Sequence, residues 1–164
     1  MEYSFAIISD EKTAEKVRDI AFEIVRLSNL KMGFQKVFLK DQKGNKVALY
    51  VLKISNVNPQ MRVSENSIDY ITVLKQLNDD FQEILSKILR RGGVIVFPKK
   101  VVDISMFINK MPSIIDLGED KDEIDAIARM ISDLSRLLMV GRSNVIKVLK
   151  TIIKDENTRL IEAY

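Results

Sequence analysis

The chain has 164 residues, of which 46% are hydrophobic and 30% are charged, and its formal net charge is +3. This balance is typical of a globular protein, and no apolar run approaches the roughly 20 residues that a membrane-spanning helix needs. Cysteine and histidine are both absent, which excludes disulfides, thiolate nucleophiles and catalytic triads that use imidazole.

The missing histidine also lowers the expectation of catalysis, because histidine is the commonest general base and the commonest ligand of transition metals. We therefore predict a protein that is not an enzyme and that binds no cofactor or metal. Residues 1–5 show no start of a secretory signal, so we expect a cytoplasmic protein that is not bound to a membrane. The abundance of Ile, Lys and Glu is typical of thermophilic proteins.

Charge is unevenly distributed along the chain. Basic residues dominate segments 31–53 and 87–100, whereas acidic residues dominate segment 116–125. Basic clusters are typical of phosphate-binding surfaces, although a solvated protein surface produces similar runs by chance.

The first predicted elements are a strand, a helix and a hairpin. Residues 3–9 form a short apolar run that predicts a strand. Ser9 and Asp10 can cap the helix that follows, in which apolar residues recur at helical spacing up to Gly33. Residues 37–40 and 47–54 predict two further strands, and the segment 41–46 between them has the Gly and Asn content of a hairpin turn.

A long helix is predicted next, over residues 67–91. Its apolar residues alternate at spacings of three and four, and Gly92-Gly93 would terminate it; these apolar residues are Leu74, Leu77, Phe81, Ile84 and Ile88. Residues 94–97, closed by Pro98, predict a strand. The order β-α-β-β-α-β predicts an α+β fold of the ferredoxin-like type, with four antiparallel strands backed by two helices.

The remaining chain is predicted to be mainly helical. Residues 101–110 could form a short helix or a strand, and two helices are predicted over 122–139 and 143–155. We therefore divide the chain into a ferredoxin-like unit, residues 1–100, and a C-terminal helical extension, residues 101–164, packed together as one compact body.

The two C-terminal helices match most of a helix-turn-helix pattern when its twenty-residue frame starts at Ile131. The expected apolar positions and the one small position all fit, and they are Leu134, Ser135, Leu138, Val140, Val145 and Val148. The ninth position, usually glycine at the turn, is Met139, and a glycine follows only at Gly141. An ordinary antiparallel helical hairpin produces the same apolar spacing.

A helix-turn-helix would assign a DNA-binding role to the second helix. Ser143 would cap it, and the side chains facing outward would contact base edges near its N-terminus and phosphates further along. The predicted nucleic-acid-binding residues are Arg142, Ser143, Asn144, Lys147, Lys150 and Lys154.

Other candidate sites have simpler explanations. Basic residues before Gly92-Gly93 complement a helix C-terminus, and the acidic residues between 116 and 125 lack the spacing of a calcium loop and suit the start of a helix. Alternating aromatic residues on the strands lack the motif of an RNA-binding sheet. Apolar stripes on the long helices indicate an oligomer or a protein partner.

The sequence thus favours a non-enzymatic regulatory factor that contacts double-stranded DNA through its C-terminal helical pair. The alternative is a protein-interaction subunit of a larger complex with no nucleic-acid role.

Overall fold

A computed structural model describes the whole chain except residues 41–42, 45, 99–103 and 154–157. The described strands form one mixed sheet in the order β2-β3-β1-β4-β5-β6. Their bounds are Glu2–Ile8 (β1), Lys31–Lys40 (β2), Lys46–Ser55 (β3), Ile68–Val73 (β4), Leu89–Phe97 (β5) and Ser113–Asp116 (β6). The neighbours β1, β4, β5 and β6 run parallel, whereas β3 is antiparallel to both β1 and β2.

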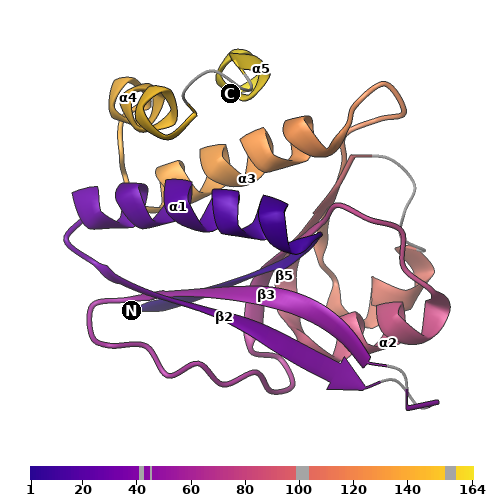
Figure 1. Cartoon of the computed structure of the whole chain (residues 1–164). Coiled ribbons are helices and arrows are strands. Elements are labelled where there is room, and N and C mark those ends of the chain that lie inside the picture. The colour runs from indigo at the N-terminus through magenta and orange to yellow at the C-terminus, as the bar shows by residue number, and fades with distance from the viewer. Residues whose placement is uncertain (41–42, 45, 99–103, 154–157) are drawn as a thin grey trace.

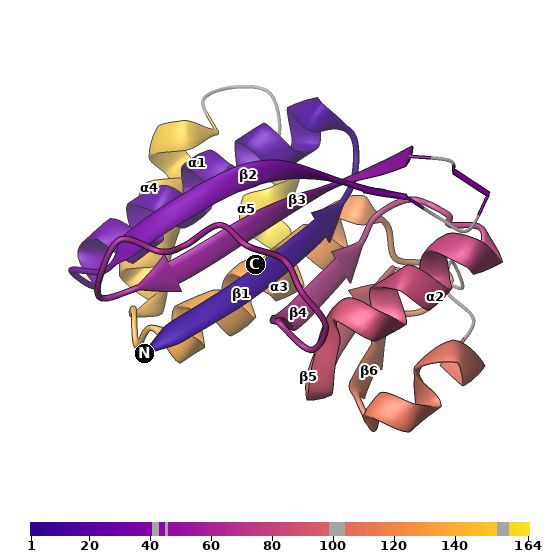
Figure 2. The ribbon, with the colours of Figure 1, turned by 90° about the horizontal axis from the view of Figure 1, so that it is seen from below.

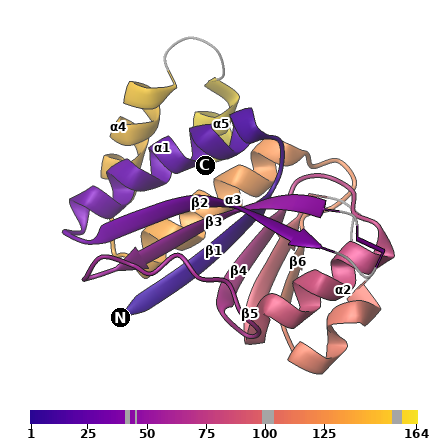
Figure 3. The ribbon, with the colours of Figure 1, turned by 60° about the horizontal axis from the view of Figure 1, so that its bottom comes forward.

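Helices cover both faces of this sheet (Figure 1). They are α1 (Glu11–Leu27), α2 (Asp79–Ile88), the 3₁₀ helix η1 (Ile104–Lys110), α3 (Glu123–Leu137), α4 (Arg142–Ile152) and α5 (Thr158–Ala163). Helices α1 and α3 lie on one face, with α4 and α5 outside them, while α2 and η1 lie on the other (Figures 2 and 3). Among the described residues, no helix is both long and apolar enough to span a membrane.

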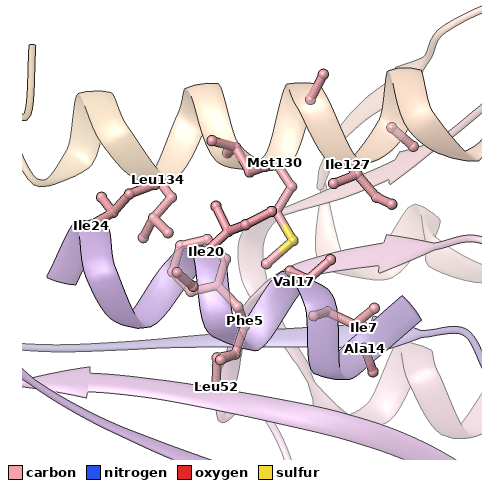
Figure 4. Close-up of a cluster of buried hydrophobic side chains, with 14 of the residues drawn as sticks. Phe5, Ile7, Ala14, Val17, Ile20, Ile24, Leu52, Ile127, Met130 and Leu134 are labelled. Carbon is pink, nitrogen blue, oxygen red and sulfur yellow. The ribbon is translucent and has the colours of Figure 1, made fainter. Parts of the chain in front are cut away.

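Strand β1 explains why both faces must be covered. Its side chains alternate, with Phe5 and Ile7 packing toward α1 and α3, and Ala6 and Ile8 toward the cluster that includes α2. A strand buried on both faces reads as a continuous apolar run, as residues 5–8 do. Figure 4 shows side chains of α1 and α3 meeting above the sheet.

Helices α1 and α3 run side by side in the same direction. Glu123 lies close enough to Asp10 for their charges to interact at the N-terminal ends. At the other ends, the Ser28 hydroxyl donates to the carbonyl oxygen of Leu138 at 3.4 Å. The parallel strands that precede the two helices impose this alignment, which brings both helix C-termini to one end of the molecule.

The mixed α/β class, the first helix and the hairpin strands are confirmed, but the specific βαββαβ arrangement is not. The predicted helix over 67–91 is wrong, because residues Ile68–Val73 form strand β4 and only Asp79–Ile88 are helical. Gly92-Gly93 therefore do not end a helix but lie within β5. An antiparallel sheet with its helices on one side was predicted. Instead, β1 and β4 pair in parallel, and α2 lies on the face opposite α1.

After residue 100 the structure adds elements that the sequence did not indicate. Strand β6 pairs with β5 and extends the sheet, and α5 follows the two predicted helices. The region left open between helix and strand is a 3₁₀ helix from Ile104 onward, and residues 101–103 lie outside the described residues. Both predicted C-terminal helices are present as α3 and α4.

Candidate functional site

The predicted DNA-contact residues lie on α4, in the outermost helical layer. Arg142, Ser143, Asn144, Lys147 and Lys150 are all exposed, and Lys154 lies outside the described residues. The predicted cap is wrong: Gly141 is the N-cap residue, with no side-chain hydrogen bond, and Ser143 lies inside the first turn.

Part of the polar side of α4 faces its neighbouring helices. The helix packs on α1 and α5, and Asn144 and Lys147 line a cavity of about 230 Å³ opposite Glu23 and Leu27 of α1. The guanidinium of Arg142 lies 5.7 Å from the centre of the Tyr164 ring. A recognition helix must insert one side into the DNA major groove, whereas this helix turns part of its polar side toward α1.

The turn between α3 and α4 begins at Met139, the position where the helix-turn-helix pattern prefers glycine. Met139 has a φ of 57°, in the left-handed region that glycine and asparagine adopt most easily. The N–H of Val140 donates to the carbonyl of Ser135, and that of Met139 to the carbonyl of Arg136, which is the Schellman pattern of helix ends. Met139 is therefore a helix-terminating residue, and its side chain is 91% exposed.

The most elaborate polar arrangement lies elsewhere, in a cavity of about 390 Å³ between α3 and the N-terminal ends of the parallel strands. Its apolar walls come from Phe5, Val94, Ile115 and Leu137. Its polar groups come from β1, β4, β5, β6 and α3, and they are Tyr3, Asp69, Tyr70, Arg90, Ser113, Arg129 and Asp133. A cavity of this size, in which polar groups converge beside apolar walls, is a candidate binding site.

Asp133 organises one side of this cavity. It accepts a hydrogen bond from the Tyr70 hydroxyl at 2.6 Å, and Arg129 Nε donates to both of its oxygens at 3.2 and 3.1 Å. Burial, together with the hydrogen bond to Asp133, holds the pKa of Tyr70 far above its usual value of 10.0. Tyr70 therefore stays protonated and is unsuited to exchange protons with a ligand near neutral pH.

Asp69 organises the other side. It accepts from the backbone N–H of Ser4 at 2.8 Å, and its second oxygen lies 2.6 Å from Arg90 Nε. Both arginines are thus oriented through Nε, and among the described residues their terminal nitrogens have no hydrogen-bond partner. This arrangement can bind an apolar group with a polar flank, but it presents no activated nucleophile or base.

Other polar features of the described residues are structural. The buried Lys53, from the basic segment 31–53, donates through Nζ to the carbonyl oxygens of Gln60 and Arg62 and holds that loop to β3. The second large cavity, about 400 Å³, combines Glu65 and Glu83 with Lys87 and Lys110 and has no dominant charge. No group of acidic residues in the described part of the chain could hold a metal ion.

The ends of the parallel strands that usually bind phosphates are acidic here. Such sites use free N–H groups at a helix N-terminus, but the Asp10 carboxylate accepts from Thr13 N–H at the start of α1. Asp122 accepts from the N–H groups of Ile124 and Asp125 at the start of α3. The acidic segment 116–125 therefore caps and complements a helix, as the sequence indicated.

Sequence reasoning missed the cavity at the opposite end. Its residues are dispersed over five elements, and Asp69, Tyr70 and Arg90 were all assigned to one helix. The run of residues 68–73, rich in the β-branched residues Ile68, Ile71, Thr72 and Val73, was the one available signal for a strand here.

No protein-family model matches the chain, and no curated protein matches it by sequence. Solved structures do match its fold. A keto/oxoacid ferredoxin oxidoreductase gamma subunit from Geobacter sulfurreducens aligns with a TM-score of 0.54 at 14% identity, covering 99% of this chain and 90% of that one. A pyruvate oxidoreductase subunit from Thermotoga maritima gives 0.56 at 10% identity with the same coverage.

A larger enzyme contains the same fold as one part. The 2-oxoglutarate:ferredoxin oxidoreductase from Magnetococcus marinus aligns with a TM-score of 0.55 at 12% identity over 99% of this chain, which spans only 29% of that protein. The chain therefore has a fold found in oxidoreductase subunits. The prediction of a DNA-binding helix-turn-helix factor is wrong, because the whole chain, including α4, follows this fold and α4 packs on α1.

Proposed function

We propose that this chain is a non-catalytic subunit of a multi-subunit oxidoreductase related to the 2-oxoacid:ferredoxin enzymes. The observation that carries this proposal is the extent of the fold likeness: 99% of this chain aligns with 90% of two such subunits. This function corresponds to the protein-interaction subunit that the sequence left as the alternative. The cytoplasmic location remains a prediction.

The chemistry of the side chains supports a role in binding rather than in catalysis. Tyr70 is held protonated, and the whole sequence lacks histidine and cysteine. Several large apolar side chains are exposed, among them Ile108, Met111 and Met139, and such residues are typical of surfaces that a partner covers.

The test is to isolate the chain, with an affinity tag, from its source cells at native expression level. We expect stoichiometric partner subunits and ferredoxin reduction that depends on a 2-oxoacid, with pyruvate and 2-oxoglutarate as the substrates tried. The chain purified alone should reduce no ferredoxin. Recovery as a free monomer, or in a complex without this activity, would contradict the proposal.

A further inference from the structure

The C-terminal ends of α1 and α3 lie at one end of the molecule, on the left in Figure 1, and both ends carry exposed apolar side chains. Leu27 is 46% exposed, Leu137 is 40% exposed and Met139 is 91% exposed. The hydrogen bond from Ser28 to Leu138 joins the two helix ends. We call Leu27, Leu137 and Met139 the apolar knob.

A comparison of the ends of α1 and α3 shows that methionine at position 139 is not the residue that would give the most stable helix end. Helix α1 ends in the same way as α3, with Leu30 N–H donating to Val25 and Asn29 N–H donating to Arg26. Both Asn29 and Met139 have a φ of 57°. Asparagine tolerates this conformation, whereas other side chains with a Cβ are strained in it by about 1 kcal/mol. Strain at an exposed residue points to a function.

A basic recess lies beside the knob. Arg136 and Arg142 line a cavity of about 240 Å³ together with Ser132, Val140 and Tyr164, and none of the described residues that line it is acidic. Arg26 is paired with Glu23 at 2.8 Å, but neither Arg136 nor Arg142 has a carboxylate partner among the described residues. Arg136 donates to the Ser132 hydroxyl at 3.5 Å and Arg142 lies over the Tyr164 ring, so both guanidinium groups can still receive a carboxylate, which they can bind in a bidentate manner.

We propose that this end of the molecule docks a segment of a partner subunit in which an acidic side chain lies next to a large apolar one. The carboxylate would enter the Arg136–Arg142 recess, and the apolar side chain would cover Met139 and Leu137. This inference rests on the proposed function, and it adds which surface binds and what chemistry the partner presents.

The test uses variants of the tagged chain in source cells that lack the untagged copy. Met139→Asn removes the exposed apolar side chain and relieves the left-handed strain, so the isolated variant should unfold at the same or a higher urea concentration. Recovery of partner subunits should nevertheless fall about tenfold. The double variant Arg136→Gln and Arg142→Gln should cause a similar loss.

The control variant is Phe38→Ala with Lys40→Gln on edge strand β2. Phe38 is 60% exposed. The start of β2 lies level with the start of β1, because Lys31 and Glu2 both pair with Ser55. Phe38, near the end of β2, therefore lies toward the other end of the sheet. This variant removes comparable apolar surface and one positive charge, and it should leave partner recovery unchanged.

A photo-crosslinker at position 139 identifies the occupant. A crosslink to an acidic segment of a co-purified subunit supports the docking proposal. A crosslink to a second copy of this chain or to nucleic acid overturns it, as does undiminished recovery with Met139→Asn. If the wild-type chain recovers no partner, the proposed function fails as well, so the two failures are distinguishable.

Discussion

Tyr70 shows how one side chain links the core to the candidate cavity. It is only 6% exposed, it packs against Phe5 with ring centres 5.2 Å apart, and its hydroxyl orients Asp133. Burial, together with the hydrogen bond that fixes Asp133 toward Arg129, raises the pKa of the phenol and keeps it protonated. Stability and the shape of the cavity therefore depend on the same contact.

Tyr70→Phe should lower the free energy of unfolding at pH 7 by about 1–3 kcal/mol, because the buried hydrogen bond goes to a charged acceptor. The folded-state pKa lies above the unfolded value of 10.0, so the stabilising contribution is complete below pH 10. Above it, the unfolded chain releases a proton that the folded chain keeps, and stability falls by about 1.4 kcal/mol per pH unit.

Urea unfolding from pH 7 to 11 measures both effects. The wild-type and Tyr70→Phe curves should converge above pH 10, because the variant lacks the titrating group. Tyr3→Phe, which removes a hydroxyl from the same cavity, is the matched control. A constant difference between wild type and Tyr70→Phe across this range would contradict the prediction.

At the level of elements, helix starts differ in how they are capped. Asp10 and Asn78 accept from backbone N–H groups at the starts of α1 and α2, with ψ values of 163° and 165°. Gly141 has a similar backbone, φ −66° and ψ 151°, but no side chain to accept a hydrogen bond. A Cβ built on Gly141 would meet no atom within 4 Å.

Gly141→Asp should therefore stabilise the protein by about 0.5–1 kcal/mol, because it adds an acceptor and a negative charge at a helix N-terminus. Gly141→Ala is the control, since it adds only the Cβ atom. Chemical denaturation should place the aspartate variant above both wild type and the alanine variant. Equal midpoints for the two variants would show that the added carboxylate does not cap α4.

Local patterns predicted elements where one segment packs as a unit, and failed where several segments contribute. Helix α1 and the hairpin followed from their own periodicity. Leu74 and Leu77 are buried beyond the end of β4, so a loop and α2 together imitated one long helix. The cavity could not be predicted, because Asp69 and Arg90 meet only through the pairing of β4 with β5.

The helix-turn-helix pattern failed for a related reason. Its apolar positions are satisfied by burial under α1 and α5 as well as by contact between the two helices. Leu134 and Val145 belong to the core that α1 helps to form, and Leu138, Val140 and Val148 pack against it. Spacing alone reports that one side of each helix is buried. It does not report which neighbour buries it.

At the scale of the whole molecule, charge is segregated along the direction of α1 and α3. Asp10, Glu11, Asp122 and Glu123 lie at their N-terminal ends, and the described basic residues Arg26, Arg136 and Arg142 lie at or just beyond their C-terminal ends. The acidic residues, Arg26 and Arg136 complement the macrodipoles of α1 and α3, whereas Arg142 is the first residue of α4. Arg159 pairs with Asp122 and Asp125 and reduces the charge of the acidic end. Arg136 and Arg142 have no carboxylate partner among the described residues, so the basic end carries the less compensated charge.

This polarity should control how fast the proposed partner associates. Charges at the rim of an interface act mainly on the association rate, and salt screens them over a Debye length of about 8 Å at physiological ionic strength. Arg136→Glu should slow association with the acidic partner at least about tenfold at low salt and should weaken the salt dependence. Glu11→Lys, at the acidic end, should change neither quantity. Stopped-flow mixing of the chain with its isolated partner subunits, at salt concentrations from about 20 to about 500 mM, measures the association rate and its dependence on salt. Effects of equal size and opposite sign, slower association with Arg136→Glu and faster association with Glu11→Lys, would show that net charge, rather than the basic end, directs assembly.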